Sequence, residues 1–172
     1  MDIIVRPFST GDAADVRSLF IRINRLLAPP DLADAFEQYI VTSLEEEIDR
    51  IADYYGEKQG AFWVAIGDAK LVGMFGLELE STGDAMELRR MYVDPDVRRQ
   101  GVARKMLQFA EAECRRRHVR QLDLSTSELQ EEALSLYRNS GFQLVREEIA
   151  ENASNKTLGG GIRRYHFTKS LK

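Results

Sequence analysis

Residues 86–106 read MELRRMYVDPDVRRQGVARKM, and this stretch joins a strand to a helix. Pro95 cannot continue a hydrogen-bonded ladder and biases the residue before it towards extended backbone, so we expect the strand to end there. Gly101 then stands at the start of the helix, where it leaves the first backbone amides unobstructed and lets a ligand come close. The stretch therefore predicts a strand, a turn and a helix entrance that is open to a ligand.

Three arginines surround this helix entrance: Arg98, Arg99 and Arg104. The unsatisfied amides and the dipole of a helix favour negative charge at its N-terminus, and guanidinium groups bind phosphate oxygens well. The pattern predicts a phosphate-binding site. The sequence contains neither a Walker-type Gly-Lys-Ser/Thr motif nor a Gly-x-Gly-x-x-Gly motif that follows a strand.

Length and composition restrict the class of protein. With 172 residues, of which 44% are hydrophobic and 30% charged, residues 1–172 suit a single domain with a sizeable core. The net charge of −4 argues against a nucleic-acid partner. A single cysteine and two histidines predict neither a disulfide nor a metal site. With no signal-like or membrane-length apolar segment, we expect a cytoplasmic protein that has no membrane partner.

Apolar residues three or four positions apart predict helices in the first 60 residues. One helix ends at Pro29-Pro30, and a second helical region extends from Asp31 to Ile51 with a break near Thr42-Ser43. The other face of the second region is acidic, which we interpret as a solvated helix face; the alternative is attraction of a cationic acceptor. The acidic residues are Asp34, Glu37, Glu45, Glu46, Glu47, Asp49 and Asp53.

The rest of the chain alternates strands and helices. Strands are expected at 3–8, 61–66, 70–80, 86–93, 121–126, 142–147 and 163–168, and helices at 101–117 and 129–139. The strand at 121–126 should lie parallel to the one at 86–93, because a helix intervenes. The fold class is thus α/β (α+β), with a mixed, mostly antiparallel sheet of six to seven strands flanked by helices.

Two details of these elements can be tested. Alternation in the strand at 70–80 places Leu71, Gly73, Phe75, Leu77 and Leu79 on one face, and Val72, Met74, Gly76, Glu78 and Glu80 on the other. The helix at 101–117 carries an inward stripe of Val102, Met106, Ala110 and Cys114.

The polar segment 151–161 is expected to be a mobile loop, either a plain connector or a substrate lid.

Two sequence blocks resemble the GNAT superfamily of acyl-CoA-dependent N-acetyltransferases. The first is Arg98-x-x-Gly101-x-Ala103, similar to that family's Arg/Gln-x-x-Gly-x-Gly/Ala signature. The second is Ala133-Leu134-Ser135-Leu136-Tyr137 followed by Gly141-Phe142, similar to the family's later helix. The blocks occur in the family's order, and the resemblance covers nearly the whole chain. It implies a parallel strand pair that splays at the cofactor site.

The resemblance also implies how acetyl-CoA would be bound. The pantetheine arm would pair with the backbone of Met91, Tyr92 and Val93. The diphosphate would be cradled by the segment Arg98, Arg99, Gln100, Gly101, Val102, Ala103 and Arg104. Gln130 stands where family members often carry a cofactor-contacting Asn. Residues 86–142 would form the acetyl-CoA-binding core, and residues 1–60 the helices that face the acceptor.

Two residues match catalytic positions of the family. Glu87 resembles the general base of its histone-modifying branch, although a salt bridge to an arginine is an equal alternative. Tyr137 matches the tyrosine that protonates the departing thiolate, and its alternative role is packing. Glu78 and Glu80 are reserve bases, that is, alternative candidates for the general base. With no plausible nucleophile in view, direct transfer in a ternary complex is favoured over a covalent acyl-enzyme.

The sequence therefore predicts an acetyl-CoA-dependent N-acetyltransferase that acts on a primary amine of a small molecule or a protein. The competing class is a non-catalytic acyl-CoA-binding or regulatory module on the same scaffold. A third class, an RNA-directed acetyltransferase, would need a basic acceptor face, and the acidic early helices oppose it. A homodimer through the final strands is suggested only by analogy with the family.

Overall fold

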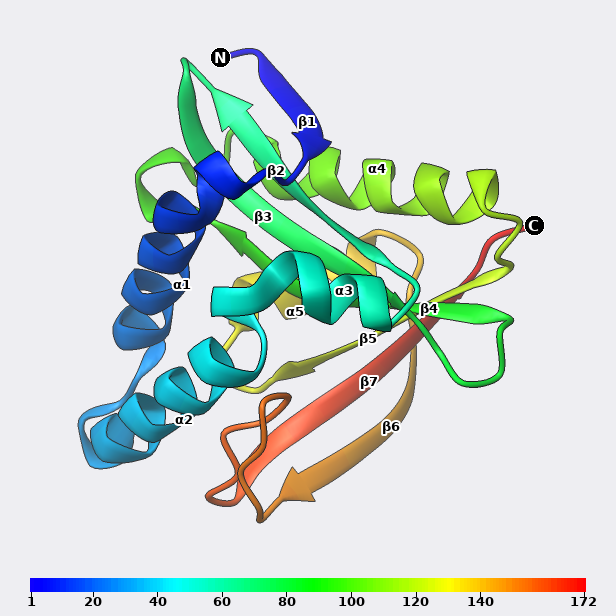
Figure 1. Cartoon of the computed structure of the whole chain (residues 1–172). Coiled ribbons are helices and arrows are strands. Elements are labelled where there is room, and N and C mark those ends of the chain that lie inside the picture. Colours follow the sequence, from blue (N-terminus) through cyan, green and yellow to red (C-terminus); the bar gives the residue numbers. More distant parts are fainter.

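A single seven-stranded sheet runs through the molecule in the order β1-β2-β3-β4-β5-β7-β6 (Figure 1). The computed structural model describes residues 1–172. The strands are β1 (Ile3–Pro7), β2 (Ala61–Gly67), β3 (Lys70–Leu79), β4 (Ala85–Val93), β5 (Gln121–Ser127), β6 (Gln143–Ala150) and β7 (Ile162–Ser170). All neighbouring strands are antiparallel except β4 and β5, which are parallel. The predicted mixed, mostly antiparallel sheet with one parallel pair is confirmed.

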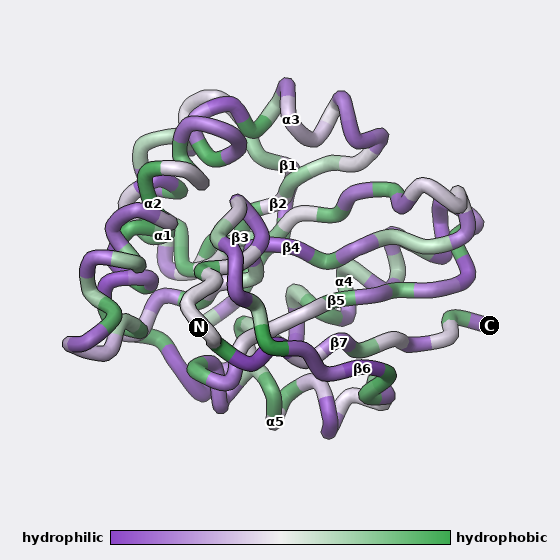
Figure 2. Tube along the Cα trace, turned by 90° about the horizontal axis from the view of Figure 1, so that it is seen from below, coloured by the Kyte–Doolittle hydropathy of each residue, from purple (hydrophilic) through white to green (hydrophobic).

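Helices cover both faces of this sheet, with α1, α2 and α3 on one face and α4 and α5 on the other (Figure 1). Their bounds are α1 (Ala13–Leu27), α2 (Ala33–Glu46), α3 (Ile51–Glu57), α4 (Val102–Arg116) and α5 (Glu131–Asn139). Hydrophobic and hydrophilic residues are mixed along each helix (Figure 2), as is typical of an element that buries one side. No helix combines the length and the apolar character that crossing a membrane requires.

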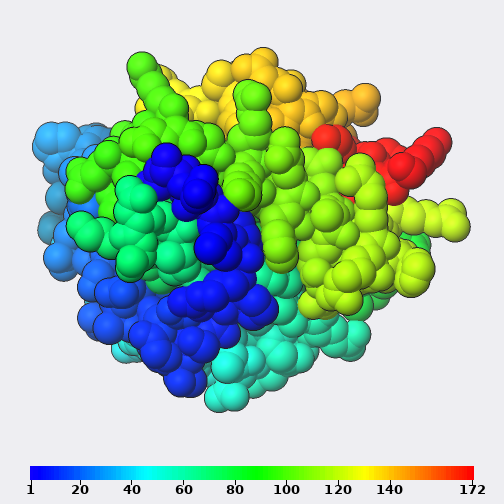
Figure 3. Space-filling model, turned by 90° about the horizontal axis from the view of Figure 1, so that it is seen from above, coloured from blue at the N-terminus to red at the C-terminus, as the bar shows by residue number.

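Helix α4 forms one half of the core. Its predicted stripe of Val102, Met106, Ala110 and Cys114 is buried and packs on the sheet near Phe75. Full burial of a side chain such as Met106 contributes roughly 1.5–3 kcal/mol, so this stripe fixes α4 on the sheet. Strand β1 lies beside the same helix (Figure 3).

The face alternation predicted for β3 holds for only part of the strand. A methyl group on Gly73 would meet Met106 of α4, and one on Gly76 would meet Tyr55 of α3, so these two glycines face opposite sides as expected. Leu71 and Val72 are exchanged relative to the prediction, because Val72 packs on the α4 side and Leu71 on the other. The cause is a bulge, visible as a register shift against β2, that reverses the faces beyond it.

The helical region after residue 31 breaks at Glu47, and the prediction of a break near Thr42-Ser43 was wrong. Helix α2 continues through Ser43 and ends at Glu46, and a short 3₁₀ turn, Ile48–Arg50, leads into α3. Glu47 was also wrongly placed on a solvated acidic face, because its side chain is 0% exposed. Two arginines draw this carboxylate into the protein, as described below.

Strand β4 contains a second bulge. Its pairing with β3 passes from Met74↔Tyr92 to Gly76↔Arg89, so that one residue of β3 opposes two of β4. Arg90 lies within the bulge and has a φ of +55°, which is uncommon for a residue with a side chain. In a regular strand, neighbouring side chains point to opposite faces; here the bulge lets Arg89 and Arg90 reach the same carboxylate.

Candidate active site

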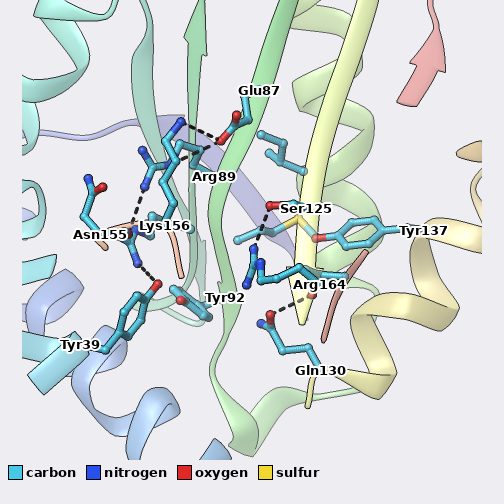
Figure 4. A pocket seen from close by; sticks show the side chains of 14 residues that line it. Tyr39, Glu87, Arg89, Tyr92, Ser125, Gln130, Tyr137, Asn155, Lys156 and Arg164 are labelled. Atoms are coloured by element: carbon cyan, nitrogen blue, oxygen red, sulfur yellow. Dashed lines mark hydrogen bonds and ion pairs between the residues drawn. The ribbon is translucent and has the colours of Figure 1, made fainter. Parts of the chain in front are cut away.

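The candidate site lies where β4 and β5 separate. The parallel pairing of the two strands ends at Leu88↔Leu124, although β4 continues to Val93 and β5 to Ser127. The predicted splayed pair is therefore present. A pocket occupies the gap (Figure 4), and its lining comprises Tyr39, Glu87, Leu88, Arg89, Arg90, Met91, Tyr92, Ser125, Thr126, Gln130, Tyr137, Asn155, Lys156 and Arg164.

Five of the predicted site residues line this one pocket: Glu87, Met91, Tyr92, Gln130 and Tyr137. They come from β4, from the turn before α5 and from α5 itself, elements that are far apart in the sequence. The fold therefore brings the two predicted catalytic residues together beside the unpaired edge of β4. Val93 and the predicted diphosphate segment lie outside the pocket lining.

Glu87 presents a carboxylate at the pocket wall. Its Oε1 lies 3.4 Å from Nζ of Lys156, and the Nε of Arg89 is 3.9 Å away, so the lysine is the nearer cation (Figure 4). The side chain retains 23% of its exposure. A carboxylate that is held in place, yet still accessible from the pocket, can accept a proton from an amine in it.

Tyr137 enters the pocket from the other side. Its ring packs edge-on against Phe142, at 5.8 Å between centroids, and in a tilted arrangement against Phe167, at 6.2 Å, while its hydroxyl points towards the pocket (Figure 4). Burial raises the pKa of Tyr137 above its ordinary value, so the hydroxyl keeps its proton at neutral pH. The same hydroxyl makes no hydrogen bond to another residue and can donate to a ligand.

A buried ion network supports the floor of the pocket. Both Arg89 and Arg90 pair with Glu47, at 2.7 and 3.0 Å, and Tyr55 donates to the same carboxylate at 2.6 Å. Burial alone would raise the pKa of the Glu47 carboxyl, but the charges of Arg90 and Arg89 outweigh burial and hold this pKa below its ordinary value. The network fixes the bulge of β4, and hence the course of its unpaired edge.

The loop between β6 and β7 lies over the pocket. The carbonyl oxygen of Asn155 accepts hydrogen bonds from Arg89, at 3.4 Å, and from Arg90. Lys156 pairs with Glu87 and, at 3.0 Å, with Glu78. Leu158 packs on Phe36 of α2 in a small apolar cluster. The loop predicted at 151–161 is present and forms part of the pocket wall; its role as a lid stays a prediction.

The two reserve bases lie outside the pocket lining. Glu78 is buried and is held by Tyr54, Arg89 and Lys156. Glu80 follows β3, where burial and the neighbouring Asp123 raise its pKa to about 8. Neither carboxylate is as accessible from the pocket as that of Glu87.

The predicted diphosphate segment forms the N-terminus of α4. Arg99 and Gly101 have positive φ values of +63° and +84°, and the first intrahelical hydrogen bond runs from the amide of Lys105 to Gly101. The amides of Val102, Ala103 and Arg104 thus precede the first bond of the helix. A methyl group on Gly101 would meet nothing within 4 Å, so the conformation, and not a lack of space, demands glycine.

The side chains of this segment differ in what they can contact. Val102 is buried in the core, so only its backbone is available to a ligand. Arg98 lies 3.9 Å from Glu132 of α5. Arg99 and Arg104 are exposed and form no ion pair, which leaves two free cations at the helix entrance.

Gln130 and Arg164 complete the pocket beyond Tyr137. The Oε1 of Gln130 accepts a hydrogen bond from Thr126 at 2.8 Å, which orients the amide at the start of α5 (Figure 4). Arg164 of β7 donates to the Ser125 hydroxyl, also at 2.8 Å. Both residues line a second cavity next to the first.

Sequence reasoning missed several residues of this site: Tyr39, Arg89, Arg90, Ser125, Thr126, Asn155, Lys156 and Arg164. One signal was available for two of them. Arg89 and Arg90 are adjacent in a central strand, and two neighbouring arginines there can share a face only at a bulge. The others come from separate elements, and no local pattern indicates that they meet.

Comparison with known proteins places this architecture in a family. Residues 30–142 match the model of the acetyltransferase (GNAT) family. N-acetylaspartate synthetase of Xenopus tropicalis is 32% identical over 112 residues, which cover 62% of this chain and 40% of that protein. The uncharacterized N-acetyltransferase YjgM of Escherichia coli (strain K12) is 29% identical over 106 residues, which cover 60% of this chain and 64% of that protein. The chain thus spans only part of the length of these relatives.

Solved structures show the same fold. An acetyltransferase of the GNAT family from Staphylococcus aureus Mu50 superposes with a TM-score of 0.75 at 19% identity, covering 99% of this chain and 100% of the other. PaiA N-acetyltransferase from Thermoplasma acidophilum, solved in complex with coenzyme A, gives a TM-score of 0.75 at 17% identity, with 99% of each chain covered. These structures share the fold, and the family match over residues 30–142 shows that the chain belongs to the GNAT acetyltransferase family.

Proposed function

We propose that this chain is an acetyl-CoA-dependent N-acetyltransferase that transfers an acetyl group to a primary amine by direct attack in a ternary complex. The observation that carries the proposal is the separation of β4 and β5 after Leu88↔Leu124. The separation leaves the backbone of Met91–Val93 without a strand partner on the β5 side, beside a pocket that contains Glu87 and Tyr137. An extended ligand can complete such an edge by hydrogen bonding as an added strand.

Membership of the family and the chain's own residues support acetyl-CoA as the acyl donor. The pantetheine arm would follow Met91–Val93 in the gap. The diphosphate would meet the free amides at the start of α4, where Arg99 and Arg104 supply unpaired positive charge. PaiA N-acetyltransferase, which shares this fold, was solved with coenzyme A, in agreement with the assignment.

The chemistry assigned to the pocket is amine attack on a thioester, which bound acetyl-CoA supplies. Glu87 takes a proton from the ammonium group of the acceptor, either directly or through water, because an amine must be unprotonated to attack. The new bond joins the amine nitrogen to the acetyl carbon, and the carbon–sulfur bond breaks. Tyr137, which is protonated at neutral pH, donates a proton to the departing sulfur, and the nitrogen gives up its second proton as the amide forms, which restores the Tyr137 hydroxyl.

The alternative is a non-catalytic acyl-CoA-binding module. The phosphate-binding features would serve such a module equally well, so they do not separate the two functions. Glu87 and Tyr137 favour the enzyme, because one pocket holds an accessible carboxylate and a tyrosine hydroxyl that has no partner in the protein.

Release of free thiol from acetyl-CoA against a panel of amines tests the proposal. We expect turnover with at least one amine, and we expect Glu87→Gln and Tyr137→Phe each to lower kcat by roughly 10²- to 10⁴-fold while acetyl-CoA still binds. Two matched controls, Glu45→Gln and Tyr165→Phe, alter residues outside the pocket lining and should leave kcat unchanged. Tight binding of acetyl-CoA without acetylation of any amine would instead favour the binding module.

A further inference from the structure

Four cationic side chains line the pocket, and carboxylates neutralise three of them. The three are Arg89, Arg90 and Lys156, and their partners are Glu47, Glu78 and Glu87, at distances of 2.7 to 3.4 Å. Three positive charges thus meet three negative ones. The fourth cation, Arg164, has no carboxylate within 4.0 Å of its guanidinium nitrogens and adds one positive charge that the protein leaves unbalanced.

The surroundings of Arg164 give it a single neutral partner. One nitrogen donates to the Ser125 hydroxyl at 2.8 Å, and Figure 4 shows the guanidinium directed into the pocket beside Ser125. Glu148 stands opposite Arg164 in the pairing of β6 with β7, but it binds His166 at 2.6 Å and Arg146 at 3.4 Å instead. Burial lowers the pKa of Arg164 below its ordinary value. A partly desolvated cation with unused donors is a site for an anion.

The position of Arg164 indicates that the anion it binds is part of the acceptor. Arg164 and Ser125 lie on the same side of the sheet as Glu87, facing the helices α1 to α3, and the charge of Glu87 acts on Arg164. Arg164 also borders the second cavity, which is lined largely by the apolar side chains of Leu27, Phe36, Leu129, Leu158 and Ile162. A proton acceptor, a free cation and an apolar cavity therefore adjoin one another.

We infer that the acceptor is a small amine that carries one carboxylate, such as an amino acid with an apolar side chain, and that Arg164 binds this carboxylate. The inference rests on the proposed transferase function. The amine of the acceptor would lie at Glu87, its carboxylate would accept two hydrogen bonds from the planar guanidinium of Arg164, and its side chain would enter the second cavity. A second carboxylate on the acceptor would find no cation that is not already neutralised, which disfavours dicarboxylic amino acids.

Matched pairs of acceptors test this inference. The probes are L-phenylalanine, L-leucine and L-aspartate, each compared with the primary carboxamide of its α-carboxyl group. Spermidine and a lysine-containing peptide complete the panel. A carboxamide keeps the amine and the side chain and removes the negative charge; because it also lowers the pKa of the neighbouring amine, each acid-to-amide ratio is compared between wild type and Arg164→Gln. We expect wild-type kcat/KM to be roughly 10- to 100-fold higher for phenylalanine or leucine than for the matching amide. Arg164→Gln should reduce this ratio to near one by lowering the value for the acid alone, and Arg164→Lys should restore part of it.

The outcomes separate this inference from the proposed function. Equal rates with acids and amides, preference for spermidine or the peptide, or an acid preference that survives in Arg164→Gln would overturn the carboxylate site and leave the transferase intact. If no amine is acetylated, the proposed function fails, and calorimetry with N-acetylphenylalanine and its amide decides the remaining question. Binding of the acid alone, and its loss in Arg164→Gln, supports the anion site; equal or no binding overturns it.

Discussion

Arg90 and Glu47 form a two-point ion pair between side chains that are 43 positions apart: Nε lies 3.1 Å from Oε2, and Nη2 lies 3.0 Å from Oε1. Both residues are buried. The pair joins the end of α2 to the bulge of β4, at which the strand leaves its parallel neighbour. Removal of the carboxylate would leave two buried guanidinium groups, of Arg89 and Arg90, without their shared partner.

We therefore expect Glu47→Gln to lower the free energy of unfolding by about 3–5 kcal/mol, because breaking a buried pair leaves an uncompensated charge. Denaturant unfolding measures this change. The matched control is Glu45→Gln in the last turn of α2, which alters an exposed residue without an ion pair and should change stability by less than about 0.5 kcal/mol. Similar losses in the two variants would show that the Glu47 network does not stabilise the fold.

Asp12 gives a prediction for the pH dependence of stability. The hydrogen bonds that Arg6 donates, at 2.8 and 2.9 Å, hold the pKa of Asp12 at about 2. A carboxyl whose pKa is lowered on folding stabilises the protein above the pKa of the unfolded chain, near 4, and this contribution is lost as the pH falls towards the folded value. Wild-type stability should exceed that of Asp12→Asn by a constant amount above pH ~4, and the difference should shrink towards pH ~2.

Unfolding midpoints at a series of pH values measure this difference. The control is Asp15→Asn, an exposed residue of the same segment that forms no ion pair. If the gap between wild type and Asp12→Asn is the same at pH ~2 as at pH ~5, the Arg6 interaction does not set the titration of Asp12.

Gly101 tests the backbone conformation at the start of α4. With a φ of +84° and nothing within 4 Å of an added methyl group, Gly101→Ala should cost about 1–2 kcal/mol of stability through backbone strain alone. It should also weaken binding of coenzyme A, because relief of the strain turns the amides away from the diphosphate. The control Gly11→Ala has equally open space and no positive φ, so it should affect neither property. Unchanged affinity in Gly101→Ala would argue against diphosphate binding at these amides.

Arg99 and Arg104 test the electrostatic part of the same site. We expect Arg99→Gln combined with Arg104→Gln to raise the Kd for coenzyme A by roughly tenfold or more at low salt, with a smaller effect at high salt because ions screen exposed charges. Arg120→Gln removes an exposed arginine that has no ion pair, directly before β5, and serves as the control. A loss of affinity that is the same in Arg120→Gln would point to overall charge, not to a local phosphate site.

The sequence predicts most of the fold, because the periodicity of apolar residues and the turns at Pro95 and Gly101 are local signals. Errors occur where tertiary contacts override such signals. Glu47 reads as one member of a solvated acidic face, and only the arginines of a distant strand explain its burial. The exchange of Leu71 and Val72 follows from a bulge, which inserts a residue without a distinct composition.

In the candidate site, too, local motifs predict some residues, and only tertiary contacts reveal the others. Glu87 and Tyr137 could be proposed from motifs in their own segments, and the structure places both in one pocket. Lys156 and Arg164 lie in the chain's last loop and last strand, and their importance depends on which carboxylates lie near them. A charge balance needs coordinates, since sequence spacing does not show which ions are partners.

A crystal structure of this chain with coenzyme A tests the central claim most directly, namely that the gap between β4 and β5 receives the pantetheine arm. We predict that the arm hydrogen-bonds to the backbone of Met91–Val93 and that the diphosphate meets the amides of Val102, Ala103 and Arg104. Coenzyme A bound away from Gly101, or no binding at all, would contradict the account, including the roles assigned to Glu87 and Tyr137.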